Sequence, residues 1–186
     1  MALNTAGITV ELREVLLRDK PRSLLLASAK GTVPVLVLPD GRVIDESVDL
    51  MRWALGQGDP EHWWRHDLEA GTNSLVEEND HVFKKHLDHY KYADRYPEHT
   101  QSFYRGKAEI FLRQLEQKLL LTRFLLDDKL TFSDVAIFPF VRQFAFVDKA
   151  WFDSAPYPKL NAWLQSFLHS DLFLSVMTKY PRWYED

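Results

Sequence analysis

Cysteine is absent from this 186-residue chain. Its absence excludes a disulfide-stapled fold, a thiolate zinc site and an iron–sulfur cluster. Long apolar runs are also absent, since the longest, at 33–39 and 135–141, fall well below the about 20 residues that cross a bilayer. The N-terminal residues lack the basic start and apolar block of a signal peptide. We therefore expect a cytoplasmic protein.

A large excess of charge of one sign is lacking too. The 23 basic and 27 acidic residues are mixed along the chain and give a net charge of -4. Such a balance disfavours a groove for nucleic acid and a patch for anionic membranes, so we expect neither partner. Hydrophobic residues make up 46% of the chain and aromatic residues 13%, which is enough for a folded core.

The first third of the chain combines strand and helix patterns. Apolar and polar residues alternate at 8–15, which predicts a strand, and 21–29 predicts a short helix. The apolar runs on either side of Pro39-Asp40-Gly41 predict a β-hairpin. Residues 46–55 predict a helix that ends at Gly56.

Beyond that helix the strand signals stop and amphipathic helical patterns take over. Apolar residues recur at helical spacing over 73–92 and 97–122, and we expect two or three further helices between 131 and 178. The sequence therefore predicts an α/β domain at 1–57 followed by an all-helical domain at 61–186.

A proline stands where the first strand of the hairpin begins. Pro34 can simply mark a strand start or edge, because proline has no N–H to donate to a ladder. Alternatively, the Val33–Pro34 peptide bond is cis, which would turn the backbone of Val33 outward to pair with a peptide-like ligand.

Glu46 and Ser47 stand where the hairpin becomes a helix. They can serve folding alone, with Asp45 or Ser47 capping backbone N–H groups and Glu46 complementing the helix dipole. The same groups can also bind an amino-acid zwitterion, since a helix start attracts a carboxylate and Glu46 attracts an ammonium group.

The segment KGTVPVLVLPDGRVIDES, residues 30–47, resembles the glutathione-binding half of a glutathione S-transferase, and the resemblance covers nearly the whole chain. It implies a thioredoxin-like α/β N-terminal domain and an all-α helical C-terminal domain, which together form the glutathione S-transferase fold. By this resemblance Val33, before cis-Pro34, pairs its backbone with the cysteinyl part of glutathione. Glu46 and Ser47 hold the γ-glutamyl end, and Lys30 lies near the glycyl carboxylate.

The resemblance also bears on the helical half. In the family, the region matching 91–98 faces the pocket for the electrophilic co-substrate, which marks Tyr92 and Tyr96 as candidate lining residues. When the resemblance is set aside, tyrosines in such a segment more often pack with the ring against apolar neighbours and the hydroxyl in contact with water. Family members are usually homodimers, and the stripe with Val76 and Phe83 either supplies that interface or faces the subunit's own core.

A helix start is marked by Thr131 and Asp134, which form an S/T-x-x-D capping pattern beside the Leu130 and Val135 staple. Pro139 predicts a kink in the buried helix that follows. This pattern resembles the family's capping box, and both interpretations give it a role in folding.

The family's first strand and its loop with a catalytic Cys, Ser or Tyr would precede Met1, because MALNTAG resembles the tail of the first helix. The incomplete N-terminal domain leads us to assign no catalytic residue. Without that strand, we expect residues 8–15 to move beside residues 34–38 or another chain to donate a strand.

Histidines occur in two helix-spaced pairs, His62 with His66 and His86 with His89. Metal sites need three or four convergent ligands, so we expect no metal ion and no cofactor, with glutathione acting as a co-substrate.

The leading hypothesis is a glutathione S-transferase-like protein. It would bind glutathione and transfer it to a small electrophile, as in detoxification, or take part in thiol–disulfide exchange. The alternative is a non-catalytic interaction or regulatory protein with the same fold, which the missing nucleophile favours.

Overall fold

A computed structural model describes residues 1–185, and it divides into two compact units. Unit 1 contains Met1–Glu61 and the chain from Leu174 onward, and unit 2 contains His62–Phe173. None of the helices in the described part of the chain combines the length and apolar composition needed to cross a membrane.

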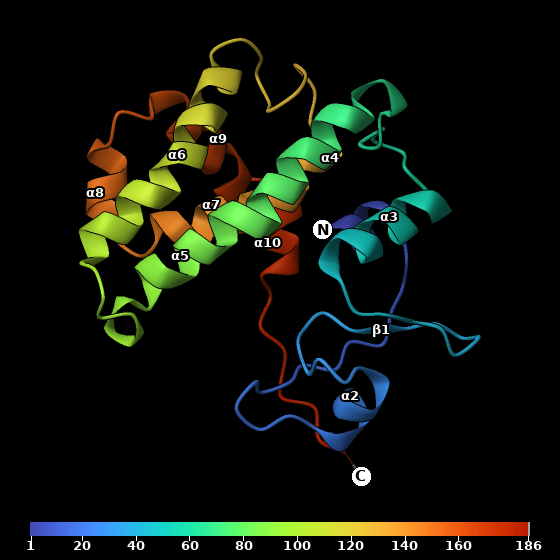
Figure 1. Cartoon of the computed structure of the whole chain (residues 1–186). Helices are drawn as coiled ribbons and strands as arrows, with labels where there is room; N and C mark the ends of the chain where they lie inside the picture. The colour runs from blue at the N-terminus through green and yellow to red at the C-terminus, as the bar shows by residue number, and fades with distance from the viewer. Residues whose placement is uncertain (186) are drawn as a thin grey trace. The chain divides into compact units, whose positions relative to one another are not determined.

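Unit 1 is built from short elements: α1 (Ala2–Thr5), α2 (Arg22–Ala27), β1 (Leu36–Val37), β2 (Val43–Ile44) and α3 (Ser47–Gln57) (Figure 1). The hairpin is antiparallel, as predicted, with Leu36 opposite Ile44 and Val37 opposite Val43. Gly41 has a φ of 87° in the turn, a conformation that residues with side chains rarely adopt.

The two helices predicted at 21–29 and 46–55 are present, but α2 ends earlier, at Ala27, and α3 ends later, at Gln57. After α2 the chain turns at Gly31, whose φ is 59° and where a Cβ atom would come within 3.1 Å of Leu25 Cδ2. Helix α3 passes through Gly56 instead of ending there, and the N–H of Gly58 donates to the carbonyl of Ala54 at 3.3 Å. One glycine costs a helix only about 1 kcal/mol relative to alanine, which does not suffice to end it.

Residues 8–15 form no strand, so that prediction is wrong. The expectation that they move beside residues 34–38 is also wrong, since within residues 1–185 strand β1 pairs only with β2. Alternating apolar and polar residues become a strand only when a neighbouring backbone pairs with their N–H and C=O groups. Donation of a strand by another chain remains a prediction.

The C-terminal tail is part of unit 1. The N–H of Trp183 donates to the carbonyl of Glu14 at 2.8 Å. The carboxylate of Glu185 accepts hydrogen bonds from the backbone N–H groups of Arg22 and Ser23, at 2.9 and 3.1 Å. The tail therefore caps α2, whose N-terminal N–H groups have no partner within the helix.

Unit 2 is helical. Its elements are η1 (His66–Leu68), α4 (Glu69–Glu78), the π-helical turn η2 (Asn79–Phe83), α5 (Lys84–Lys91), η3 (Ala93–Arg95), α6 (Gln101–Leu119), α7 (Phe132–Ala145), α8 (Lys149–Ser154) and α9 (Pro158–Leu168), and α10 (Asp171–Val176) carries the chain onward. The predicted helix at 73–92 corresponds to α4, η2 and α5, and the one at 97–122 to α6. Between residues 131 and 178 the structure has four helices, α7 to α10, instead of the two or three predicted.

The core of unit 2 is formed by apolar side chains of η2, α5, α6, α7 and α9. Its fully buried members include Phe83, Leu87, Leu112, Leu115, Ile137, Phe138, Phe144 and Leu160. Val76 and Phe83 are only 7% and 0% exposed, so their stripe faces the subunit's own core. The interpretation that it supplies a dimer surface is therefore wrong for these two residues.

The predicted capping box is present at the start of α7. Asp134 is fully buried, and its carboxylate accepts four hydrogen bonds, two from the backbone N–H and hydroxyl of Thr131, one from the N–H of Leu125 and one from Trp163 Nε1. Burial raises the pKa of Asp134, and these hydrogen bonds oppose the shift. One side chain thus joins the loop before α7, the start of α7 and α9.

Asp134→Ala should lower the free energy of unfolding by at least about 3 kcal/mol, because it leaves several buried donors without an acceptor. Asp134→Asn should lower the free energy of unfolding by less, since the amide oxygen can still accept hydrogen bonds from Leu125 and Trp163. Urea unfolding measures both changes, with the exposed Asp94→Ala as the control. Equal stability of Asp134→Ala and the wild type would contradict the role given to this carboxylate.

Candidate functional site

A network of charged and polar side chains lies at the end of the hairpin in unit 1. The buried Ser28 hydroxyl donates to Asp45 Oδ2 at 2.6 Å. Lys30 Nζ lies 3.0 Å from Asp45 Oδ1 and 2.5 Å from Glu46 Oε1. The structure thus brings together Lys30 and Glu46, two of the residues singled out in the sequence, and adds Ser28 and Asp45, which the sequence analysis did not assign to the site.

Two pKa values in this network are displaced. The hydrogen bond from Ser28, followed by that from Lys30, lowers the pKa of Asp45. Contacts with Glu46 and then with Asp45 raise the pKa of Lys30. One cation therefore faces two carboxylates, which leaves a net negative charge beside the start of α3.

The start of α3 is open. Glu46 is the N-cap residue, and among residues 1–185 no side chain accepts a hydrogen bond from the N–H groups of the first turn. The capping predicted for Asp45 or Ser47 is therefore wrong: Asp45 instead binds Ser28 and Lys30, and Ser47 is exposed. That Glu46 complements the helix dipole stays a prediction. Free N–H groups at a helix start attract an anion, and the Glu46 carboxylate beside them attracts a cation.

The Val33–Pro34 peptide bond is cis, in agreement with the second interpretation of the sequence. Val33 is 46% exposed, and its backbone makes no hydrogen bond with any part of residues 1–185. Val33 lies three residues before Leu36, and Ser47 lies three residues after Ile44, the residue that pairs with Leu36. Val33 and the start of α3 therefore both adjoin the open end of the hairpin.

The two candidate tyrosines do not share a cavity. The Tyr96 ring packs against the His89 ring at an interplanar angle of 39°, with ring centroids 4.0 Å apart, and both line a small cavity of about 220 Å³. The Tyr92 ring lies beside Lys91 Nζ and the Arg95 guanidinium, at 4.9 and 4.6 Å from its centroid. Tyr92 lines neither of the two cavities described in unit 2.

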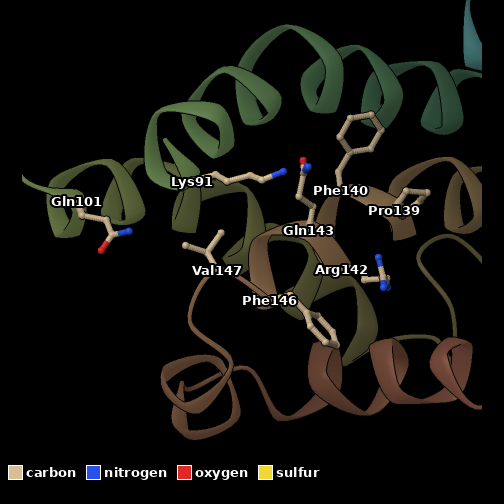
Figure 2. Close-up of a pocket in the computed structure, with 8 residues that line it drawn as sticks. All are labelled: Lys91, Gln101, Pro139, Phe140, Arg142, Gln143, Phe146 and Val147. Atoms are coloured by element: carbon tan, nitrogen blue, oxygen red, sulfur yellow. The ribbon is translucent and has the colours of Figure 1, made fainter. Parts of the chain in front are cut away.

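A larger cavity of about 610 Å³ lies at the end of α7. It is lined by Lys91, Gln101, Pro139, Phe140, Arg142, Gln143, Phe146 and Val147 (Figure 2). The sequence analysis missed these residues. A signal was present in the run VAIFPFVRQF, residues 135–144, where Arg142 and Gln143 are the only polar side chains.

Metal ligands do not converge in the described part of the chain. No group of three or more histidine and acidic side chains there is placed to hold a metal ion.

Two family models match the sequence. The N-terminal domain of glutathione S-transferases matches residues 1–55, and their C-terminal domain matches residues 93–166. The chain belongs to the glutathione S-transferase family.

Solved glutathione S-transferases share its fold. The bacterial enzyme BphK, solved as a ternary complex, aligns with a TM-score of 0.79 and 22% identity over 95% of this chain and 90% of that chain. Glutathione S-transferase 1-6 of the mosquito Anopheles dirus species B aligns with a TM-score of 0.78 and 19% identity, over 94% of this chain and 85% of that chain. A glutathione S-transferase of Methylobacillus flagellatus, solved with glutathione bound, aligns with a TM-score of 0.77 and 19% identity, over 94% of this chain and 89% of that chain. A search of the curated proteins found no match.

These matches confirm the predicted fold class, in which a thioredoxin-like domain precedes a helical domain. The two-stranded sheet with α2 and α3 belongs to the thioredoxin-like part of this glutathione S-transferase, and α4 to α9 belong to the helical part.

Ser28→Ala should raise the pKa of Asp45 toward its ordinary value, because the charged carboxylate then loses its principal donor. Carboxyl-carbon NMR over a pH series measures the shift. Asp40 serves as the internal control, since Arg42 lowers its pKa and remains in place. An unchanged midpoint for Asp45 would contradict the assigned hydrogen bond.

Proposed function

We propose that this chain binds reduced glutathione at the hairpin end of unit 1 and transfers it to a small electrophile or disulfide. The observation that carries the proposal is the open start of α3, with Glu46 before it and Ser47 in its first turn, which adjoins the same end of the hairpin as the free backbone of Val33. A tripeptide that carries an α-amino acid group at one end matches these elements.

Each element suits one part of glutathione. The N–H groups of the first turn of α3 and the Ser47 hydroxyl suit the γ-glutamyl carboxylate, and Glu46 suits its ammonium group. The backbone N–H and C=O of Val33 suit the cysteinyl residue, whose peptide can pair with them as a strand does. Lys30 suits the glycyl carboxylate, which would then compete with Glu46 and Asp45 for the Nζ atom.

In the transfer step, the thiol proton leaves to solvent and the thiolate sulfur donates an electron pair to an electrophilic carbon. The leaving group departs with its bonding pair. With a disulfide, the thiolate forms a new S–S bond and displaces the other sulfur as a thiolate. We assign no residue of the described chain to thiol activation, and we place the reaction in the cytoplasm.

Isothermal titration with reduced glutathione tests the proposal. Glu46→Gln and Ser47→Ala should each raise the dissociation constant by about tenfold, the effect expected for losing a hydrogen bond to a charged group. Glu11→Gln changes an exposed acid elsewhere in unit 1 and should leave the affinity unchanged. A wild-type protein that gives no saturable binding would refute the proposal.

A second candidate function is that of a non-catalytic docking protein. It is favoured by the aliphatic side chains that unit 1 exposes, among them Leu26 at 74%, Val37 at 56% and Leu17 at 56%. Purification of a stoichiometric complex with another protein, together with no glutathione binding, would support this function over the first.

We also propose that the chain forms a homodimer. Because Val76 and Phe83 are buried, the interface would use the outer face of η2 and its neighbouring helices, where Val82 is 49% exposed. Multi-angle light scattering should give about twice the 21.8 kDa mass of the chain. A single-chain mass across a concentration series would contradict the dimer.

A further inference from the structure

The C-terminal tail contacts the part of unit 1 that leads into α2. Arg182 Nη2 donates to the carbonyl and the carboxylate of Asp19, at 3.1 and 2.5 Å. The Arg13 guanidinium carbon lies 4.7 Å from the ring centroid of Trp183. An ion pair and a cation–π contact thus hold the tail just before Glu185, whose carboxylate binds the start of α2.

Glu185 supplies the cap that α2 lacks by itself. The N-cap residue is Pro21, whose side chain cannot accept a hydrogen bond. The two oxygens of the Glu185 carboxylate instead accept one hydrogen bond each, from the N–H groups of Arg22 and Ser23. Hydrogen bonds from a helix start to a carboxylate are charge-assisted, and the helix dipole favours them further.

We propose that Glu185 is a positioning residue for glutathione binding. By holding the start of α2, it keeps Ser28 and Lys30 in place beyond the other end of that helix, where both bind Asp45. The inference rests on the proposed function, because Lys30 and the start of α3 belong to the glutathione site named there. It gives the tail a part in that site without any contact between the tail and the ligand.

Helix α2 depends on contacts at its two ends. It has only six residues, Arg22–Ala27, and none of them is buried. Leu25 and Leu26 are 48% and 74% exposed. A helix this short does not form in water by itself, so its place must be set by the groups around it. Those groups are the Glu185 carboxylate at its start and the partners of Ser28 at its end.

The end of α2 leads directly into the polar network at the hairpin end. Ser28 is the C-cap residue; its N–H donates to the carbonyl of Leu24 at 2.9 Å, and its hydroxyl donates to Asp45 at 2.6 Å. Lys30 follows two residues later, and the N–H of Gly31 donates to the Ser28 carbonyl at 3.1 Å. Helix and turn thus form one hydrogen-bonded segment, so a movement at the helix start is passed on to the network.

Removal of the Glu185 carboxylate should therefore loosen the hydrogen bond from Ser28 to Asp45. Because that bond is the main cause of the lowered pKa of Asp45, Glu185→Ala should raise this pKa toward its ordinary value. Carboxyl-carbon NMR of the full-length protein without glutathione measures the change, with Asp40 as the internal control. Isothermal titration should show a dissociation constant for reduced glutathione raised by about fivefold, the factor expected for the loss of a helix cap.

A second-site variant separates positioning of α2 from other effects of the substitution. Pro21→Asp places a carboxylate at the N-cap position, where the extended backbone, with φ of -64° and ψ of 149°, suits a capping side chain. Combined with Glu185→Ala, it should restore both the Asp45 midpoint and the affinity for glutathione. Lys179→Gln changes an exposed charge of the same tail and should alter neither.

An Asp45 midpoint that stays unchanged in Glu185→Ala, or a change that Pro21→Asp does not reverse, would overturn the inference. Unchanged glutathione affinity in Glu185→Ala, beside a wild-type protein that binds glutathione, would overturn it too. A wild-type protein without saturable glutathione binding refutes the proposed function instead, and the Asp45 midpoint then still decides whether Glu185 positions the network.

Discussion

The helical unit of this protein depends on one buried carboxylate. Asp134 accepts hydrogen bonds from Leu125, Thr131 and Trp163, so it holds a loop, the start of α7 and α9 in one arrangement. Burying the charge is unfavourable, and the raised pKa of Asp134 reflects that cost. The hydrogen bonds offset it only when all these segments are in place, and α7 then carries Arg142 and Gln143 to the cavity at its far end.

Unit 1 is organised differently, around a surface network. Ser28 and Lys30 bind the carboxylate of Asp45, which is consequently not used to cap α3. The start of α3 is left open, and it adjoins the same end of the hairpin as the free backbone of Val33. A helix start without a cap is unfavourable for folding alone, so its presence at the hairpin end agrees with a role in binding a ligand.

Local signals in the sequence were sufficient for part of this structure. The capping box at Thr131, the hairpin turn at Gly41 and the helix start at Ser47 each depend on neighbouring residues, and each was predicted. Residues 8–15 form no strand, because a strand needs a neighbouring backbone to pair with. The alternation of apolar and polar residues does not reveal whether such a neighbour exists. Glu185 caps α2, and Lys91 lines the same cavity as Arg142. Each of these arrangements joins residues far apart in the sequence, so no local pattern could predict it.

Amide NMR during a glutathione titration tests the central claim most directly, because it reports where the ligand binds. Saturable shifts should appear at the N–H groups of Val33, Ser47 and Val48 and should disappear in Ser47→Ala combined with Glu46→Gln. Saturable binding whose shifts fall entirely outside the hairpin end and the start of α3, or no saturable shift at all, would contradict the account.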